Sequence, residues 1–318
     1  MNRRELLAGG VALSTLALTG AVTRGARVAA LPFFARHHLP IGVQLYTLDP
    51  DLDSDFEGTL HRIARIGFRS VEMAGYHGRT ASRIRRAFNA AGLACTSAHI
   101  QPTARGNGPS FAEPEALARD MHVIGVTDVI LPIPLFPQDF RPPKETNAGD
   151  GFRASGKAMR AGDWRRTAEF LNQHARTLAP LGLRVSYHNH NFEFAPLGDT
   201  NGLQILLRET DPKLVRFEMD AGWVAAAGKD PIALLRAHPG RFTQIHVKDV
   251  KPSTIPNFEA RQDPIEVGSG RMDWRNILPA AYQAGVRHFY VEQEPPYPGP
   301  RLQSVEKSFR YLAGLTTA

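Results

Sequence analysis

Eight apolar, strand-like runs alternate with eight amphipathic, helix-like runs between residues 41 and 315. Strands that alternate with helices form a parallel sheet, and eight such pairs over about 275 residues predict a closed (β/α)8 barrel, the TIM barrel. An open, doubly wound sheet is the alternative, but no glycine-rich phosphate turn follows the first strand-like run. The strand-like runs are 41–48, 68–75, 93–100, 127–135, 184–190, 215–223, 242–250 and 288–294.

The first thirty residues differ from the rest of the chain. Arg3 and Arg4 precede Glu-Leu-Leu, an apolar stretch runs from Leu6 to Val22, and small residues follow. This order resembles a twin-arginine (Tat) signal peptide, so 1–30 is expected to be an export signal and the mature protein periplasmic or secreted. A membrane anchor and a chance basic start are the alternatives. The Tat route carries folded proteins, which suits a protein that takes up a metal before export.

Composition excludes several classes of protein. The net charge is +7, and 1–30 holds four arginines and one glutamate, which leaves the mature chain near +4. Its arginines are scattered through amphipathic stretches, so no nucleic-acid partner is expected. No apolar run of about 18 residues occurs beyond the signal, so no membrane span is expected in the mature chain. The single cysteine, Cys95, permits no internal disulfide.

A long connection rich in Pro, Gly and charge covers 137–160. Loops of this length are often functional, and closure of this one over a site is a hypothesis from the sequence.

Acidic and imidazole side chains stand near the ends of the last four strand-like runs. They are Glu193, Asp220, His246 and Glu292. A strand buried in a barrel should be nearly all apolar, and active-site groups of a barrel come from the carboxyl ends of its strands. A shared divalent ion explains these residues together, and carboxylate oxygens with imidazole suit Mn, Mg, Co or Zn.

Each of these residues has an alternative role. Asp220 is either a metal ligand or the cap of the next turn, and the ligand role is favoured because Asp230 caps the following helix. Glu294 competes with Glu292, which lies deeper in its apolar run. Glu218, two residues before Asp220, is a buried partner or a group that holds a ligand in place.

The fifth run and Lys248 add further candidates. His188 and His190 share one face of the run 184–190, and Glu193 follows it. Glu193 is favoured as the metal ligand with His188 as its substitute, and the others would be acid–base or substrate groups. Lys248 points the same way as His246 and is expected to orient a substrate hydroxyl or stabilise an oxyanion. A salt bridge to Asp249 or Glu218 is the alternative.

Five motifs carry a family resemblance: YHNHNFEF, EMDAGW, HPGRFTQIHVKD, VGSGRMDW and YVEQE. Residues 41–315 resemble the xylose isomerase-like TIM barrel superfamily, also called the sugar phosphate isomerase/epimerase family, which includes ketose 3-epimerases and inosose dehydratases. The resemblance implies one divalent ion on a Glu, Asp, His, Glu set, with Asp220, His246 and Glu292 in the last three places. The first Glu would fall near Tyr187 or His188, which is a departure. The resemblance also implies a possible homo-oligomer.

A second departure from the family pattern is Trp223, which stands where the epimerases have a histidine.

The expected function is a divalent-metal-dependent isomerase or epimerase that removes a proton next to a carbonyl through a metal-bound enediolate. The export signal and the lack of a phosphate loop predict an unphosphorylated sugar or keto-sugar. The alternatives are a lyase, dehydratase or hydrolase of a 3-keto sugar, keto-glycoside or cyclitol, and a non-catalytic sugar-binding barrel. The expected catalytic residues are Glu292, Glu193, His190 and Lys248, and the expected substrate-binding residues are His188, Trp223 and Glu72.

Overall fold

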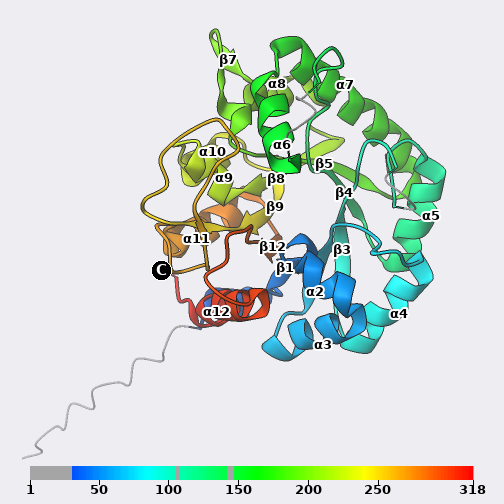
Figure 1. Ribbon diagram of the computed structural model, residues 1–318, viewed down its shortest axis with the longest axis vertical. Coiled ribbons are helices and arrows are strands. Elements are labelled where there is room, and N and C mark those ends of the chain that lie inside the picture. Colours follow the sequence, from blue (N-terminus) through cyan, green and yellow to red (C-terminus); the bar gives the residue numbers. More distant parts are fainter. Residues whose placement is uncertain (1–30, 105–107, 142–146, 318) are drawn as a thin grey trace, which may run out of the picture. The chain divides into compact units, whose positions relative to one another are not determined.

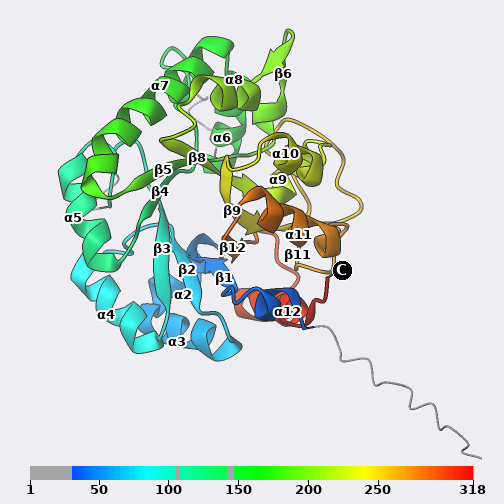
Figure 2. The ribbon, with the colours of Figure 1, turned by 180° about the vertical axis from the view of Figure 1, so that it is seen from behind.

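The computed structural model describes residues 31–104, 108–141 and 147–317, so the expected signal peptide lies outside the described residues. These described residues form a ring of helices around a closed parallel barrel (Figures 1 and 2). The order β1-β12-β9-β8-β5-β4-β3-β2 joins each strand to the next barrel strand in the chain and the last to the first. The (β/α)8 barrel predicted from the alternation is therefore confirmed.

All eight barrel strands correspond to runs expected from the sequence. Asp220 in the sixth strand pairs in register with His246 in the seventh, and His246 pairs with Tyr290 in the eighth, so the polar residues of these strands lie side by side. The barrel strands are β1 (Gly42–Gln44), β2 (Ser70–Met73), β3 (Ala94–His99), β4 (Asp128–Leu131), β5 (Arg184–His188), β8 (Val215–Asp220), β9 (Phe242–Val247) and β12 (His288–Val291).

Two small antiparallel sheets stand apart from the barrel. They pair β6 (Pro196–Leu197) with β7 (Thr200–Asn201), and β10 (Asp249–Val250) with β11 (Pro264–Ile265).

The described helices surround the barrel, and none of them combines the length and apolarity needed to cross a membrane. They are α1 (Phe33–Arg36), α2 (Asp49–Ser54), α3 (Phe56–Ile66), α4 (Ala81–Ala91), α5 (Pro114–Ile124), α6 (Ala148–Lys157), α7 (Ala161–Leu178), α8 (Gly202–Glu209), α9 (Ala221–Ala226), α10 (Pro231–Ala237), α11 (Trp274–Ala284) and α12 (Arg301–Gly314). Short 3-10 turns are η1 (Leu45–Leu48), η2 (Ala179–Leu181) and η3 (Phe192–Phe194).

Local chemistry explains where the helices begin and end. The Asp55 side chain accepts a hydrogen bond from the Gly58 amide at 3.0 Å and so caps the start of α3. That helix ends at Gly67, whose φ of 127° suits glycine and few other residues. At α10 the Asp230 carboxylate accepts from Ile232, and Pro231 occupies the first turn, where its missing amide costs nothing.

Two segments differ from the sequence-based expectation. Residues 148–157, expected inside an irregular connection, form α6, because Asn147 caps its first turn by accepting from the Asp150 amide at 2.9 Å. The run 215–223, expected as one strand, ends at Asp220, and α9 begins at the next residue. Both differences arise from a side-chain cap at a helix start.

The apolar core lies between the strands and the helices, and the barrel interior is polar. Outward side chains such as Val71, Val185 and Phe217 are fully buried in the apolar cluster. Inside the barrel, the amide of Gln44 donates to Glu72, and that pair is also fully buried. The apolar layer therefore stabilises the barrel, and the interior is free to hold polar groups.

Candidate metal centre and active site

Four buried side chains meet at the carboxyl ends of neighbouring strands. His188 ends β5, Asp220 ends β8, His246 lies near the end of β9 and Glu292 directly follows β12. One ligand atom from each lies within 4.8 Å of those of the other three. We call these four residues the outer group. It contains three of the four residues expected as metal ligands from the sequence, with His188 in the place of Glu193.

Lys248 lies among the carboxylates of this group. Its Nζ is 2.7 Å from Asp220 Oδ2, 2.7 Å from Glu292 Oε2 and 2.7 Å from Glu294 Oε1. Burial disfavours the charged ammonium, but these three carboxylates outweigh burial and hold the Lys248 pKa well above its usual range. The salt-bridge partners considered from the sequence, Asp249 and Glu218, are not the ones found.

Glu292 stays ionised for a related reason. Burial would raise the pKa of its carboxyl group, but Lys248 and His246 hold that pKa well below the usual range. Lys248 itself is fully buried, and it is not one of the residues that line the adjacent cavity. It therefore acts on the cavity through the carboxylates that it holds.

Asp220 uses its two oxygens differently. Oδ1 accepts a hydrogen bond from the Trp223 amide at 2.9 Å and caps α9, and Oδ2 faces Lys248. The cap considered from the sequence is therefore present, and it uses only Oδ1, which leaves Oδ2 for the metal-ligand role considered beside it. Gly222 lies against the lysine, because a Cβ atom there would sit 2.7 Å from Lys248 Cγ. The Ala-Gly-Trp sequence after Asp220 therefore places both the carboxylate and the lysine.

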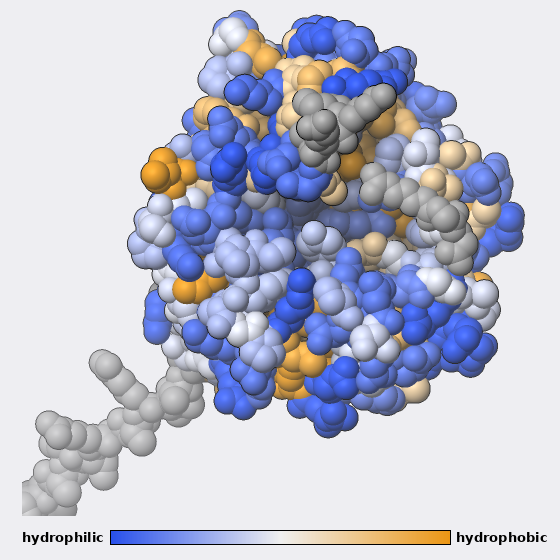
Figure 3. All heavy atoms as spheres, viewed as in Figure 1, coloured by the Kyte–Doolittle hydropathy of each residue, from blue (hydrophilic) through white to orange (hydrophobic). Residues whose placement is uncertain are grey.

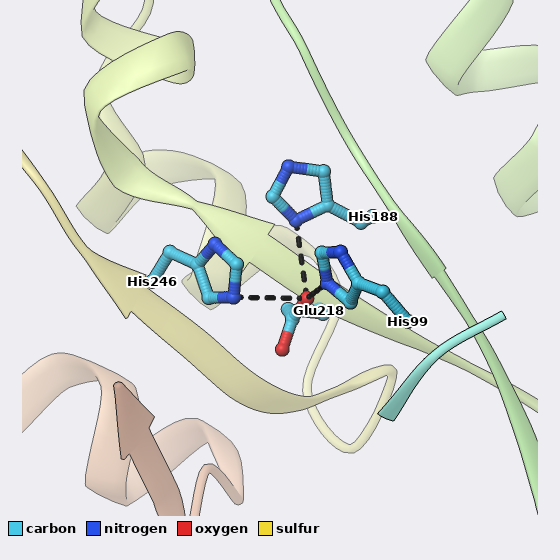
Figure 4. Close-up of side chains that lie close together, drawn as sticks. All are labelled: His99, His188, Glu218 and His246. Carbon is cyan, nitrogen blue, oxygen red and sulfur yellow. Dashed lines mark hydrogen bonds and ion pairs between the residues drawn. The ribbon is translucent and has the colours of Figure 1, made fainter. Parts of the chain in front are cut away.

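A second layer of acidic and imidazole groups lies beneath the outer group. Oε2 of Glu218 is 2.9 Å from His99 Nε2, 3.1 Å from His188 Nδ1 and 3.2 Å from His246 Nε2 (Figure 4). Nε2 of His246 also lies 2.7 Å from Glu72 Oε1. Each of the two imidazoles of the outer group thus has a carboxylate at its other nitrogen, the arrangement that fixes the tautomer of a metal-binding histidine.

The protonation of the histidines follows from these neighbours. Burial holds His188 neutral, with a pKa well below its usual range, and the nearby imidazoles act in the same direction. Burial also opposes the charge on His246, but Glu218 and Glu292 outweigh it and raise its pKa. For His99, Glu72 and Glu218 overcome burial and raise the pKa to about 9. A neutral His188 keeps the lone pair that a metal ion requires.

The two lower carboxylates respond differently to the same neighbourhood. Burial would raise the pKa of Glu72, but His99 and His246 lower it instead. Burial raises the pKa of Glu218, and the charge of Glu72 adds to this effect. Glu72, expected as a substrate contact, has no exposed surface and accepts hydrogen bonds from Gln44 and Ser97. The structure therefore places it below the cavity.

Glu193 and His190 lie beside the outer group. Oε1 of Glu193 accepts a hydrogen bond from the Tyr187 hydroxyl at 2.7 Å and is 3.8 Å from His190 Nδ1. The 3-10 turn η3 directs Glu193 toward Tyr187, so the structure does not bring it into the group that contains Asp220. His190 lines the cavity, and its ring stacks on Phe192 at 5.4 Å between centroids.

A cavity of about 600 Å³ opens above the outer group, a size suited to a small polyhydroxylated ligand. Figure 3 shows that this face of the molecule is hollowed near its centre, among mainly hydrophilic residues. Trp223, expected as a sugar contact, lines the cavity, as does Phe152 of α6. Helix α6 therefore forms part of the cavity wall.

Sequence reasoning missed His99 and the wall formed by α6. His99 is the last residue of β3, and the polar end of an otherwise apolar run was the signal that could have identified it. The expected ligands came from strands five to eight only, whereas the lower layer draws on β2 and β3 as well.

The donor set of the outer group fits a divalent ion. It offers two imidazole nitrogens and two carboxylate oxygens, all buried, and His188 is held neutral. A set of nitrogen and oxygen donors fits Zn, Co or Mn better than a set of oxygen donors alone. Among the expected cofactors, the structure thus supports a divalent ion without distinguishing the element.

The fold and this group define a (β/α)8 barrel with a polar, metal-compatible site at the carboxyl ends of its strands. The chain belongs to the xylose isomerase-like TIM barrel family, whose model matches residues 60–315.

Two similar proteins are inosose dehydratases. One, from Lactiplantibacillus plantarum, is 28% identical over 169 residues, which cover 47% of this chain and 53% of the relative. The other, from Clostridium botulinum, is 23% identical over 210 residues, which cover 65% of this chain and 68% of the relative. The matches thus span about half to two thirds of these curated relatives.

Two solved structures share the fold. A sugar phosphate isomerase/epimerase from Parabacteroides distasonis is 23% identical, with a TM-score of 0.66, over 86% of this chain and 94% of the other. The IolI protein with a bound zinc atom is 12% identical, with a TM-score of 0.59, over 86% of this chain and 98% of the other. At these identities the likeness shows the fold alone.

Proposed function

We propose that the protein is a divalent-metal-dependent dehydratase, a lyase that removes water from an unphosphorylated keto-cyclitol or 3-keto sugar. The observation that carries this proposal is the buried outer group beneath a cavity of about 600 Å³. The similarity to inosose dehydratases favours this lyase, the alternative from the sequence, over the isomerase placed first.

The reaction needs a group that removes a proton next to the carbonyl and a group that assists departure of the hydroxyl. Glu292 is ionised and borders the cavity, so it is assigned as the base. His190 and His99 also line the cavity, and His99, with its raised pKa, carries a proton to give at neutral pH. A divalent ion held by the outer group would polarise the carbonyl of the ligand.

The remaining residues of the site hold the carboxylates in place or keep water out of part of the cavity. Before a metal ion binds, Lys248 holds Asp220, Glu292 and Glu294 in place. It reaches the cavity only through Glu292 and Glu294, because Asp220 does not line the cavity. Trp223 and Phe152 supply apolar faces that exclude water from part of the cavity. Lys248 is therefore a positioning residue in this proposal, in place of the substrate-contacting role expected from the sequence.

Isomerisation or epimerisation is the second candidate. It is favoured by the presence of two proton carriers, Glu292 and His190, on the walls of one cavity, since epimerisation must remove a proton and return one. Both reactions begin with the same proton removal, and they differ in whether a hydroxyl leaves.

Product mass distinguishes the two. The mature protein, loaded with Zn²⁺, Co²⁺ or Mn²⁺, is incubated with keto-cyclitols and 3-keto sugars, and products are analysed by mass spectrometry in H₂O and D₂O. A product lighter by one water supports the dehydratase, and a mass-neutral product with solvent deuterium supports the isomerase. No reaction and no exchange, with the Glu292→Gln variant behaving like the wild type, would overturn both and favour a sugar-binding barrel.

Export by the Tat route is part of the proposal, and it rests on the sequence of 1–30 alone. Fusion of 1–30 to a folded reporter, with Arg3 and Arg4 changed to Lys as the control, tests it. Export of the reporter that depends on both arginines is the expected result.

A further inference from the structure

Two imidazoles of the site face carboxylates on both of their edges. His188 turns Nδ1 toward Glu218 at 3.1 Å and Nε2 toward Asp220 at 3.8 Å. His246 turns Nε2 toward Glu218 at 3.2 Å and Nδ1 toward Glu292 at 2.9 Å. The outward nitrogens belong to the outer group, so the inward nitrogens remain available to bind a second ion together with other side chains.

A third imidazole completes that set. His99 Nε2 lies 2.9 Å from the same Glu218 oxygen, and one ligand atom from each of His99, His188, Glu218 and His246 lies within 4.8 Å of the others (Figure 4). We propose that these four residues form a second, inner cation position. It takes an ion of the zinc or cobalt class when the Lys248 ammonium, and not a metal ion, pairs with the carboxylates of the outer group. This position goes beyond the proposed function, and it does not require the outer group to be catalytic.

Buried negative charge supports the inner position. Glu72 and Glu218 both approach Nε2 of His246 and have no exposed surface. Oε1 of Glu218 has no hydrogen-bond partner among the described residues. Gln44 and Ser97 donate hydrogen bonds to Glu72, but the ion-pair partners of both carboxylates among the described residues are histidines alone. Two such buried carboxylates form an electrostatically costly group, and a divalent ion would neutralise it.

The location of the Lys248 ammonium determines which of the two positions can take a metal ion. Its ammonium lies 2.7 Å from Asp220 Oδ2 and 2.7 Å from Glu292 Oε2, the oxygens that face the outward nitrogens of the two histidines. A cation in the outer position must therefore displace the ammonium. The inner position contains no lysine or arginine, so an ion fills it without breaking those ion pairs.

The two positions exclude each other while each shared imidazole keeps one proton. With the ion inside, His188 and His246 carry their protons on the outward nitrogens, which face Asp220 and Glu292. With the ion outside, the protons lie on the inward nitrogens and face Glu218. In either state the unused carboxylates orient the ligating rings.

The donor types define the ion. Three imidazole nitrogens and one carboxylate oxygen match the ligands that Zn²⁺ takes in tetrahedral sites, and Co²⁺ substitutes there with a visible spectrum. Mg²⁺ and Ca²⁺ prefer oxygen donors and are not expected to bind at the inner position.

The test removes one position at a time and follows Co²⁺ and Zn²⁺ binding by absorption and by elemental analysis. The Asp220→Asn/Glu292→Gln double variant lacks the outer carboxylates and should still bind about one equivalent of Co²⁺ with the absorption of a four-coordinate, nitrogen-rich site. Adding His99→Ala to it should weaken binding by about 10²-fold or more, since loss of a ligand should cost at least as much as the largest effect of losing an outer-shell partner. His190→Ala in the same background is the matched control, because His190 belongs to neither group, and it should leave affinity and spectrum unchanged.

Two outcomes would overturn the inner position. One is a double variant that folds, by circular dichroism, and binds neither Co²⁺ nor Zn²⁺. The other is a His99→Ala protein whose affinity and spectrum equal those of its parent. Should the triple variant fail to fold, Glu218→Gln in the double variant replaces it, because glutamine keeps the shape and removes the charge. Since no readout is enzymatic activity, failure of the dehydratase proposal would leave this result unaffected.

Discussion

Lys248 Nζ lies 2.7 Å from Asp220 Oδ2, and both side chains are fully buried. An ion pair inside a protein stabilises little relative to an apolar pair, but removal of one partner leaves a buried charge uncompensated. The ammonium therefore supplies a counter-charge to Asp220 and keeps Glu292 ionised when no metal ion is bound, and the first of the following predictions depends on it.

Lys248→Met should destabilise the metal-free protein by about 3 kcal/mol, because Asp220 and Glu292 lose their cation. Saturating Zn²⁺ should restore part of this loss, since the ion then neutralises the same oxygens. Urea denaturation with and without a chelator measures both quantities. Lys307→Met is the control: its contact with Glu266 is 3.3 Å and the lysine side chain is 59% exposed, so a loss below about 1 kcal/mol is expected. Equal losses in the two variants would contradict the role given to Lys248.

His188→Ala and Glu193→Gln separate the two candidates for the metal ligand of the fifth strand. His188→Ala should lower the affinity for Zn²⁺ by about 10²-fold or more, because His188 belongs to both positions. Glu193→Gln should retain the ion, because its carboxylate is bonded to Tyr187 outside both groups. Isothermal titration of the chelator-treated protein measures both, and loss of the ion in Glu193→Gln alone would reverse the assignment.

Asp249 is predicted to be a structural residue. Its carboxylate accepts hydrogen bonds from the amides of Val250 (2.9 Å), Gly268 (2.9 Å) and Met272 (3.1 Å) and from Trp274 Nε1 (3.1 Å). Asp249→Ala leaves these donors without an acceptor and should cost about 3 kcal/mol of stability or more, measured by thermal and urea unfolding.

The control for that measurement is Asp273→Ala, in the segment 268–274 whose Gly268, Met272 and Trp274 donors bond to the Asp249 carboxylate. The Asp273 side chain bonds only to the exposed Asn276 amide among the described residues. A loss below about 1 kcal/mol is expected there. A loss of stability in Asp249→Ala as small as in this control would mean that the segment 268–274 keeps its structure without the buried carboxylate.

Cys95 should be chemically silent in the folded protein. The side chain is buried, and burial raises the pKa of the thiol to about 12. The reactive thiolate is therefore scarce at pH 7 and still scarce at pH 9, where an ordinary cysteine would be largely ionised. Reaction with a chromogenic disulfide reagent should be slow at both pH values and become fast in urea. Rapid reaction of the native protein, rising between pH 7 and 9, would show that the thiol is accessible.

The barrel could be predicted from the sequence because the two periodicities of the chain alternate eight times, which favours a closed parallel sheet when no glycine-rich phosphate turn follows the first strand. The strand-end position likewise brought Asp220, His246 and Glu292 together in the prediction, and the structure places them in one group. Fold and site were accessible wherever a residue's position along a strand determines its place in space.

The other features of the site could not be predicted, because they depend on contacts that a residue's position along its strand does not encode. Whether Glu193 or His188 joins the group depends on η3, a turn that the sequence pattern does not reveal. His99 went unnoticed because its partners Glu72 and Glu218 come from strands two and six, distant in the chain. Lys248 was placed on the correct face, but its burial behind three carboxylates follows only from the close approach of α9.

That approach limits how the sequence can change. A Cβ atom on Gly222 would lie 2.7 Å from Lys248 Cγ and 3.0 Å from its Cβ, near the root of the side chain where it cannot swing away. Residues 222 and 248 should therefore covary among relatives: where 222 is alanine or larger, 248 should be shorter than lysine. In such proteins the two carboxylates would lose the lysine and keep only the His246 imidazole and a bound metal ion as counter-charges, and the metal-free polypeptide would be harder to purify than this one.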